Sequence, residues 1–380
     1  MRLQNLAYSQ HEGEPNAWRF HDLRLGDVNL LVGKNATGKS RVLNVINGLA
    51  RRVAGVTKNN PITGTYDALF DDEGTAIRYQ LEFRDRAVHR EELTLDGTPL
   101  LTRGAGGEGM IHTNELGKLI RFQTSPNELA AVARRDKIQH DFFEPLYAWG
   151  SSTFHYAFGT PLGRDVLALA NKDARDDFDP KDPKQVIQIY RMGVTELGES
   201  FNEAIVRDMA AIGYPLDEIG VQPITSLTVT SPFPGEVLNI FVKESGLPGH
   251  TEQAEMSQGM FRALSVVIQL NYAAMALSPV CVLIDDIGEG LDFERSCALI
   301  DILKGRAGPE LQLILSTNDR FVMNNIPLEN WTILTHHEND CVIRNYENSR
   351  EMFEEFRFTG LSNFDLLTTE FYSAGEKEVE

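Results

Sequence analysis

Residues 33–40 read Gly33-Lys34-Asn35-Ala36-Thr37-Gly38-Lys39-Ser40 and fit the pattern G-x-x-x-x-G-K-[ST]. An apolar run, Val28 to Val32, precedes this stretch, and a segment with helical spacing of apolar residues, Arg41 to Leu49, follows it. In a strand–loop–helix turn of this kind the glycines let backbone N–H groups close on phosphate oxygens, and the helix points its positive end at the same anion. The stretch therefore predicts a site for the phosphates of a nucleotide.

Two side chains of this loop have defined chemistry. Lys39 is expected to reach the β and γ phosphates, and the Ser40 hydroxyl is expected to ligate Mg²⁺. ATP and Mg²⁺ are therefore the predicted cofactors. The residues predicted to contact the nucleotide here are Gly33, Lys34, Asn35, Ala36, Thr37, Gly38, Lys39, Ser40 and Arg41.

The composition is that of an ordinary globular protein. Of 380 residues 42% are hydrophobic and 24% charged, and the length fits two domains or one large domain with an insertion. The three cysteines, Cys281, Cys297 and Cys341, form no C-x-x-C pair, so the pattern favours neither a disulfide framework nor a zinc site. The first residues lack the apolar core of a signal peptide, and no apolar run reaches about 18 residues. These features predict a cytoplasmic protein without a membrane partner.

The formal net charge of −19 disfavours broad, passive binding to nucleic acid, because such binding depends on neutralising phosphates. Local basic stretches, Arg51-Arg52 and Arg134-Arg135-Asp136-Lys137, could still form a basic face, although stretches of this kind are more often solvated surface. Nucleic acid stays open as a partner, but the charge does not indicate it.

Alternating apolar and polar residues predict strands over 3–8, 18–25 and 76–101, and the Asp96-Gly97 pair in the last region predicts a hairpin turn. Further expected elements are a glycine-rich surface loop over 102–110, short strands over 119–122, 227–230 and 237–242, and one or two amphipathic helices over 183–212. This order predicts an antiparallel β lobe followed by helices.

A second set of chemical groups follows the continuous apolar run from Val280 to Ile284. This run ends in Asp285-Asp286, as expected of a buried parallel strand that delivers carboxylates to its C-terminal edge. Asp285 is predicted to support Mg²⁺, and Asp286 lies where an acid could orient or activate the attacking water. Before this strand Ser257 is a suitable N-cap for a helix with a buried face.

Three stretches, in their order along the chain, resemble the Walker A, signature and Walker B to D-loop elements of ABC-type ATPase heads: residues 33–40, Met256 to Leu264 and Leu283 to Asp292. Within that class the chain is similar to the SMC-like group, which includes RecF-type repair proteins and the ATPase domain of OLD-family nucleases. The similarity covers roughly residues 1–50 and 250–335. It implies an α/β fold of the P-loop NTPase type, with a mixed sheet, an antiparallel β lobe and a helical insertion.

The resemblance also implies roles in an ATP sandwich. Ser257 and Gly259 match signature positions that contact the γ-phosphate of ATP held by the opposite subunit, and Asp292 matches the D-loop aspartate. Gln123 is the candidate Q-loop glutamine, expected to contact nucleotide and Mg²⁺, and Gln139 is the alternative.

The catalytic positions depart from the family pattern. Asp286 takes the place of the usual glutamate and is one methylene shorter, and Asn318 stands where the switch histidine is expected and cannot take a positive charge. Gln258 replaces a glycine of the signature. The predicted catalytic residues are Lys39, Asp286 and Asn318. Hydrolysis is expected to be slow because of these departures.

The expected organisation is an N-terminal ATPase lobe (1–55), an antiparallel β lobe with a helical insertion (56–250), a C-terminal ATPase lobe (251–335) and an acidic, aromatic tail (336–380). The tail is expected to pack on its own head rather than on a partner. His336-His337, followed by Glu338 and Asp340, is a weaker candidate metal site, and a solvated loop is favoured there.

The leading hypothesis is an ATPase switch that forms a homodimer around two ATP molecules and controls a protein effector, such as a nuclease or toxin, in bacterial defence against phage. The effector and the pathway are implied by the resemblance alone. The alternatives are a repair ATPase that acts directly on DNA and a scaffold that binds ATP without hydrolysing it.

Overall fold

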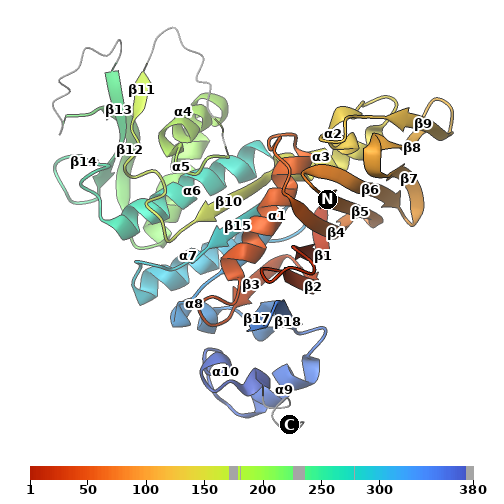
Figure 1. The fold of residues 1–380 in the computed structure, drawn as a ribbon. Helices are drawn as coiled ribbons and strands as arrows, with labels where there is room; N and C mark the ends of the chain where they lie inside the picture. Colours follow the sequence, from red (N-terminus) through yellow and green to blue (C-terminus); the bar gives the residue numbers. More distant parts are fainter. Residues whose placement is uncertain (171–178, 180, 226–235, 278, 374–380) are drawn as a thin grey trace. The chain divides into compact units, whose positions relative to one another are not determined.

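The computed structural model describes residues 1–170, 179, 181–225, 236–277 and 279–373. The chain divides into two compact units, shown as a ribbon in Figure 1. Unit 1 comprises Met1–Thr153 and Ile326–Glu380, and unit 2 comprises Phe154–Asn325. Unit 2 is thus inserted between the two segments that build unit 1.

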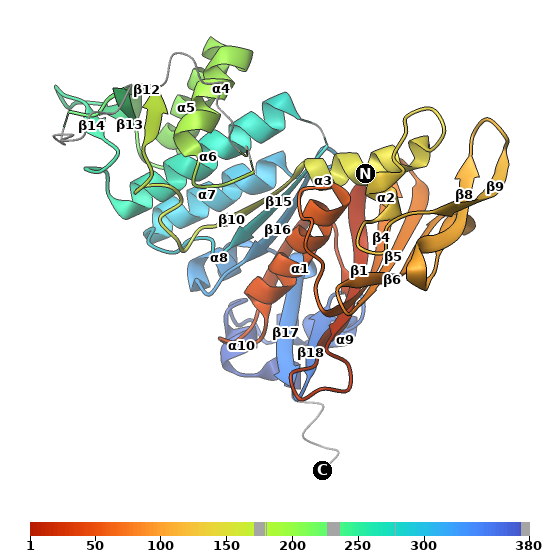
Figure 2. The same ribbon diagram turned by 45° about the horizontal axis from the view of Figure 1, so that its top comes forward.

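Unit 1 contains a mixed sheet. β3 (Val28–Val32) pairs in parallel with β17 (Trp331–His337), and β17 forms an antiparallel hairpin with β18 (Asp340–Asn345). From β18 the sheet continues through β2 (Trp18–Arg24), β1 (Arg2–Gln10), β4 (Thr63–Asp72), β5 (Thr75–Arg84), β6 (Ala87–Leu95), β7 (Thr98–Arg103), β8 (Glu108–Thr113) and β9 (Lys118–Gln123). Figure 2 shows the β8–β9 hairpin at one end of this sheet.

The antiparallel lobe has the hairpin turn that the sequence predicts. β6 and β7 are joined at Asp96-Gly97, where both residues have positive φ, 47° and 78°. Two positive φ values are what a tight hairpin turn requires, and Asp-Gly is a preferred pair for it. The prediction of an antiparallel lobe over this region is confirmed.

The glycine-rich stretch 102–110 is not a simple surface loop. A short 3₁₀ turn, η1 (Ala105–Gly107), leads directly into β8. A Cβ atom on Gly107 would lie 2.0 Å from the Thr124 carbonyl oxygen, and one on Gly109 would lie 2.1 Å from the Thr102 carbonyl oxygen. Here the glycines permit close approach of neighbouring backbones within a sheet.

Two helices of unit 1 pack closely. α1 (Lys39–Val53) begins inside the stretch 33–40, called the P-loop from here on, and buries one face. α3 (Glu144–Ser151) lies against it. A Cβ atom on Gly150 would lie 2.6 Å from the Ala50 carbonyl oxygen, so the two backbones come into direct contact there. The short α2 (Ala130–Ala133) and η2 (Asp141–Phe143) connect β9 to α3.

A buried ion pair fixes the start of α2 to the antiparallel lobe. Arg103 donates to the Glu91 carboxylate at 3.0 Å, and both side chains are fully buried. The same carboxylate accepts bonds from the Tyr79 hydroxyl (2.9 Å) and from the backbone N–H groups of Ala130 (2.7 Å) and Ala131 (2.9 Å). A buried carboxylate is tolerated when its oxygens have partners in this way.

Unit 2 is built on the adjacent strands β10 (Thr153–Ala157), β15 (Val280–Asp285) and β16 (Leu311–Ser316), of which β15 and β16 are parallel. A second, antiparallel sheet holds β11 (Ala168–Ala170), β12 (Leu216–Pro223), β13 (Glu236–Glu244) and β14 (Thr251–Glu252). β13 confirms the strand predicted over 237–242, whereas the strand predicted over 227–230 lies outside the described residues.

α6 (Gln258–Ala276) of unit 2 is buried over residues 259–273. α4 (Val186–Leu197) and α5 (Glu199–Ala211) both pack against it and confirm the helices predicted over 183–212. α7 (Phe293–Arg306) precedes β16, and α8 (Arg320–Asn325) follows it. No helix of the described part of the chain is both long and apolar enough to cross a membrane.

The C-terminal segment of unit 1 contains η3 (Leu328–Asn330), α9 (Arg350–Phe358), α10 (Asp365–Thr368) and η4 (Phe371–Ser373). Phe353 and Phe356 are buried, whereas Phe358 is 90% exposed. These two aromatic residues of the tail therefore pack in the core of the chain itself, as expected.

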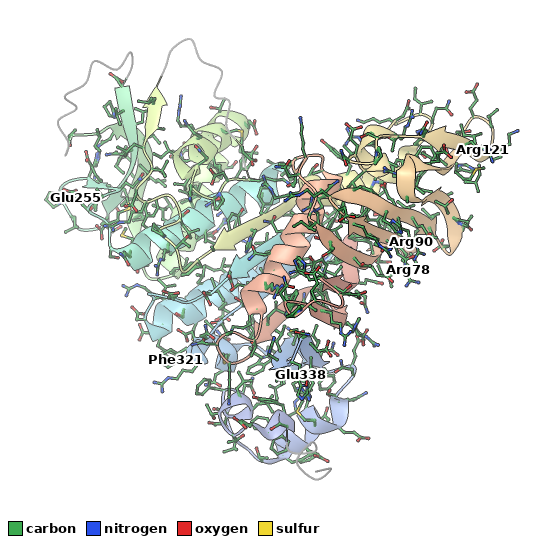
Figure 3. All side chains as sticks on the ribbon, in the orientation of Figure 1. Arg78, Arg90, Arg121, Glu255, Phe321 and Glu338 are labelled. Carbon is green, nitrogen blue, oxygen red and sulfur yellow. The ribbon has the colours of Figure 1, made fainter. Side chains whose placement is uncertain are left out.

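The Glu91–Arg103 pair gives a prediction about stability. Arg103→Met should lower the free energy of unfolding by about 3 to 5 kcal/mol, because it leaves a buried carboxylate without its cation. The matched control is Arg90→Met, which breaks the exposed pair with Glu92 on the same β6 and should cost less than about 1 kcal/mol. Arg90 is labelled in Figure 3, and chemical denaturation measures both losses. Equal losses would show that burial of the first pair is unimportant.

Candidate functional site

The P-loop between β3 and α1 is closed by its own lysine. The buried Lys39 ammonium donates to the backbone carbonyl oxygens of Gly33 at 2.8 Å and Lys34 at 3.2 Å. The Thr37 hydroxyl donates to the same Lys34 carbonyl at 2.9 Å. These contacts fold the loop back over the start of α1, in the shape the sequence pattern predicts.

Two glycines of the loop are required by geometry. A Cβ atom on Gly33 would lie 2.5 Å from the Leu334 carbonyl oxygen of β17, so a larger residue would separate β3 from its neighbour. Gly38 has φ 106° and is the N-cap of α1, and within the described residues no side chain caps this helix end. The first amides of α1 can therefore be used by an anion.

The other loop residues face outward. Lys34, Asn35, Ala36, Ser40 and Arg41 are exposed. The Arg41 guanidinium lies 4.1 Å from the centre of the Trp18 ring. Partial burial of the guanidinium lowers the pKa of Arg41, against the influence of Tyr8. The exposed hydroxyl of Ser40, at the beginning of α1, is free of the core packing and suits the predicted metal-ligand role.

A cavity of about 950 Å³ lies beside the loop. One wall is the P-loop from Lys34 to Thr37, and another is the C-terminal segment at Glu370, Tyr372 and Ser373. The remaining lining residues come from β17 and β18: Thr335, His336, His337, Val342 and Arg344.

In unit 2 the ends of β15 and β16 hold the predicted acids. The fully buried Ser316 hydroxyl donates to the Asp285 carboxylate, and its oxygen accepts the backbone N–H of Asp286 at 3.0 Å. The backbone N–H of Phe158, after β10, donates to the Asp285 carbonyl oxygen at 2.8 Å. Asp285 is thus held from both neighbouring strands.

Asp286 and Asn318 lie together. The Asn318 side-chain amide donates to the Asp286 carboxylate at 3.4 Å. Asp286 has φ 55°, which is uncommon for a residue with a side chain and is often found where function requires a special orientation. The two residues predicted to be catalytic in this unit are therefore brought into contact.

The predicted signature residues are also structural. Ser257 is the N-cap of α6 and its hydroxyl accepts the Met260 N–H at 3.2 Å. A Cβ atom on Gly259 would lie 2.5 Å from the Gly290 carbonyl oxygen, so this glycine lets α6 approach the loop after β15. Asp292 is the N-cap of α7 and accepts the Arg295 N–H at 3.0 Å, the main cause of its lowered pKa.

Arg262 and Ser316 are the residues that sequence reasoning missed. The Arg262 guanidinium, on α6, donates to the carbonyl oxygens of Thr160 (3.1 Å), Glu289 (2.9 Å) and Gly159 (3.0 Å). It ties the loops that follow β10 and β15 to one helix. An arginine within the apolar run 259–270 was a signal for such a role, since a buried charge requires partners. Ser316 gave no comparable signal.

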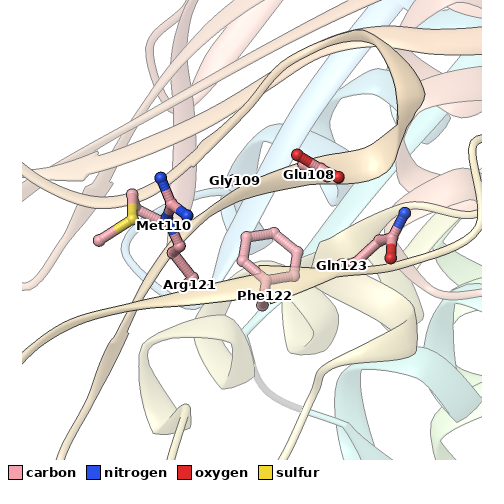
Figure 4. Close-up of a pocket in the computed structure, with 6 residues that line it drawn as sticks. All are labelled: Glu108, Gly109, Met110, Arg121, Phe122 and Gln123. Atoms are coloured by element: carbon pink, nitrogen blue, oxygen red, sulfur yellow. The ribbon is translucent and has the colours of Figure 1, made fainter.

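The structure corrects the prediction for Gln123. This residue ends β9, the last strand of the sheet in unit 1, whereas the P-loop follows β3, the first strand of that unit's order. Adjacent strands are about 4.8 Å apart, so the strands between them keep Gln123 away from the loop. Figure 4 shows Gln123 in a hollow lined by Glu108, Gly109, Met110, Arg121 and Phe122.

The alternative glutamine is at the same end of the sheet. The Gln139 side chain donates to Glu115, in the turn between β8 and β9, at 3.0 Å. Neither glutamine is therefore brought to the P-loop.

The candidate metal site at the β17–β18 turn is not supported. His336, His337 and Glu338 are exposed, and Asp340 pairs with Arg19. Figure 3 labels Glu338 at this turn. Among the described residues no group of three His, Cys, Asp or Glu side chains is arranged to hold a metal ion.

Each unit, taken by itself, contains an oxygen ligand of the kind that hard cations prefer. In unit 1 the donor is the Ser40 hydroxyl, and in unit 2 it is the Asp285 carboxylate, which Ser316 orients. Hydroxyl and carboxylate oxygens are ligands that Mg²⁺ prefers, and Mg²⁺ commonly takes only one or two carboxylates together with substrate phosphates.

Comparison with known proteins gave matches among solved structures. No family model matches the chain, and no curated protein matches it. A structure of an SMC head bound to the C-terminal winged-helix domain of ScpA is 15% identical, with 90% of this chain and 98% of that chain covered and a TM-score of 0.49. The SMC head domain from Thermotoga maritima is 15% identical, with coverages of 91% and 99% and a TM-score of 0.45.

A third similar structure is an Smc head domain with an extended coiled coil, bound to the C-terminal domain of ScpA derived from Pyrococcus furiosus. It is 14% identical, with 94% of this chain and 100% of that chain covered and a TM-score of 0.46. At these identities and TM-scores the similarity says nothing about activity.

The close contact at Gly259 predicts that this glycine is needed for stability even when no nucleotide is present. Gly259→Ala should lower the free energy of unfolding by about 1 to 3 kcal/mol without any nucleotide present, because the new Cβ would overlap the Gly290 carbonyl. Gly305→Ala is the control, since nothing lies within 4 Å of its Cβ position in α7. It should be neutral or stabilising by up to about 1 kcal/mol. Chemical denaturation compares the two, and an unchanged stability of Gly259→Ala would contradict the contact.

Proposed function

We propose that this chain is an ATP-binding switch protein that hydrolyses ATP slowly. The observation that carries the proposal is the P-loop, in which Lys39 is already buried under the loop carbonyls and the N-terminus of α1 has no side-chain cap among the described residues. The amides at the start of α1 would then be available to phosphate oxygens.

In unit 1, Lys39 would exchange its carbonyl contacts for phosphate oxygens, and Ser40 would ligate Mg²⁺. The exposed side of the loop would also contact the nucleotide, through Lys34, Asn35, Ala36 and Arg41. When bound, Mg²⁺ would neutralise charge on the phosphates.

In unit 2, Asp285 would support the metal ion, and Asp286 would orient the water that attacks the γ-phosphate. Ser316 would act as a positioning residue, because it holds the side chain of the first acid and the backbone of the second. Asn318 would keep the Asp286 carboxylate in place, since its amide can donate a hydrogen bond but cannot take a proton at neutral pH. This arrangement fits slow turnover.

We further propose that two copies enclose two ATP molecules, with Ser257, Gly259 and Asp292 contacting the nucleotide of the opposite copy. ATP would then select the closed dimer, and hydrolysis would release it. The lobes would be 1–55 and 251–335, with 56–250 as the β lobe and helical insertion and 336–380 as the tail.

The downstream partner is proposed to be a protein effector, such as a nuclease or toxin, in a cytoplasmic defence against phage. The net charge of −19 supports a protein partner over passive binding to nucleic acid. The assignment to phage defence rests on the family resemblance.

A second candidate function is a scaffold that binds ATP without hydrolysing it. The contact between Asn318 and Asp286 favours it, because an amide in this place cannot relay protons as a histidine can. Steady-state turnover separates the scaffold from the switch.

The first test is ATP turnover together with oligomeric state. Lys39→Ala should abolish ATP binding, and Asp286→Ala should retain ATP, lose about 100-fold or more in turnover and accumulate as a dimer. Phosphate release and light scattering measure these effects, with and without duplex DNA. The matched control is Asp301→Ala, an exposed acid on α7 of unit 2, which should behave as the wild type.

Each alternative has its own outcome in this test. Dimerisation with ATP but no turnover in the wild type would identify the scaffold. Salt-sensitive stimulation of turnover by DNA would identify a repair ATPase that acts on DNA. Wild-type ATP binding and turnover by Lys39→Ala would refute a nucleotide site at this loop.

Ser316 can be tested separately from general stability. Ser316→Ala should lower turnover about 10-fold, because Asp285 loses its hydrogen-bond donor, and should cost about 1 to 3 kcal/mol of stability. Ser265→Ala is the matched control, since Ser265 is equally buried in unit 2 and its hydroxyl donates to the Leu162 carbonyl at 3.1 Å. It should cost similar stability and leave turnover unchanged. Equal losses of turnover would remove the positioning role.

A further inference from the structure

The C-terminal segment of unit 1 contacts the P-loop directly. The Glu370 carboxylate pairs with the Lys34 ammonium. This hydrogen bond is the main cause of the raised pKa of Lys34, and Tyr372 adds to it. Lys34 is thereby engaged by an acid of the same chain.

The contact lies at the cavity of about 950 Å³ beside the loop. Lys34, Asn35, Ala36 and Thr37 form one wall, and Glu370, Tyr372 and Ser373 form another. Arg344 and two histidines, His336 and His337, also line it. Glu370 therefore lies in a cavity that also contains two positively charged side chains, Lys34 and Arg344.

The segment is held to unit 1 on both sides of Glu370: by α10 before it and, after it, by the Phe371 ring, whose centre lies 5.4 Å from that of the buried Phe356. Leu366 and Leu367 of α10 are buried, at 0% and 7% exposure, so they hold the helix to unit 1. Glu370 follows with φ 53°, and residues 371–373 are only half-buried. A residue with a side chain in this conformation costs free energy.

Nucleotide and Glu370 would compete for the same cation. Phosphates bound at residues 33–40 would bring several negative charges next to Lys34, where a carboxylate already lies. Like charges at such distances repel, and both favour the one ammonium. Each ligand would therefore weaken the binding of the other by the same factor.

We propose that residues 365–373 act as a built-in competitor of the nucleotide, in which Glu370 occupies Lys34 until ATP displaces it. This proposal rests on the proposed ATP binding at the P-loop. It makes the position of the C-terminal segment a readout of nucleotide occupancy, within a single copy of the chain.

The test compares the affinity of three full-length proteins for a non-hydrolysable ATP analogue with Mg²⁺. Glu370→Gln should bind about fivefold more tightly than the wild type, because the competing charge is gone. Glu355→Gln is the matched control: it removes one exposed acid from α9, changes the net charge equally and should leave the affinity unchanged. Hydrogen exchange of residues 365–373 should rise when the analogue binds the wild type, but not when it is added to Lys39→Ala.

The outcomes distinguish this proposal from the one it rests on. If Glu370→Gln binds the analogue more tightly than the wild type, or binds it when the wild type does not, the competitor role of residues 365–373 is supported. Equal affinities of the wild type and Glu370→Gln, with binding still lost in Lys39→Ala, overturn the competitor and leave the ATP site standing. Binding by neither the wild type nor Glu370→Gln overturns both proposals.

Discussion

The constraint on which the candidate site depends is the burial of one ammonium group. Lys39 is 7% exposed, and a buried cation is tolerated only where oxygen atoms converge on it. The carbonyls of Gly33 and Lys34 do so, and this fixes the path of the loop. The loop in turn requires β3 to lie against β17, where the Leu334 carbonyl leaves room for a glycine only.

In unit 2, hydrogen bonds from two side chains hold the loops that follow the strands. Ser316 connects the end of β16 to the two acids after β15, and Arg262 connects the loops after β10 and β15 to α6. The helix start that resembles a signature motif is therefore mechanically linked to the strand that carries Asp285. A displacement of α6 would be transmitted to the acids through few, well-defined contacts, which is what a nucleotide-dependent switch needs.

Local sequence patterns predicted β3, the P-loop, α1, β15 and the N-cap Ser257, because strand burial, turn chemistry and capping are encoded within a few residues. They failed for Gln123, because the local sequence around a glutamine after a strand does not show whether the strand is central or at the edge of the sheet. The order of strands in a sheet depends on contacts distant in the sequence. The glycines 107 and 109 indicated a loop, although they permit close backbone contact within a sheet. Ser316 and Arg262 act through partners distant in the sequence, which no spacing reveals.

The division of unit 1 into two segments of the chain has a consequence for biosynthesis. β3 is made early, but β17, its parallel neighbour, follows only after the whole of unit 2. At about 5 to 20 residues per second, the ribosome needs roughly 15 to 60 s to bridge this interval. During that time β3 and the P-loop lack their neighbour β17. Unit 2, in contrast, has all its residues available before β17 is made. Nascent chains of this protein should therefore depend on chaperones more than their size suggests, and unit 2 should fold first.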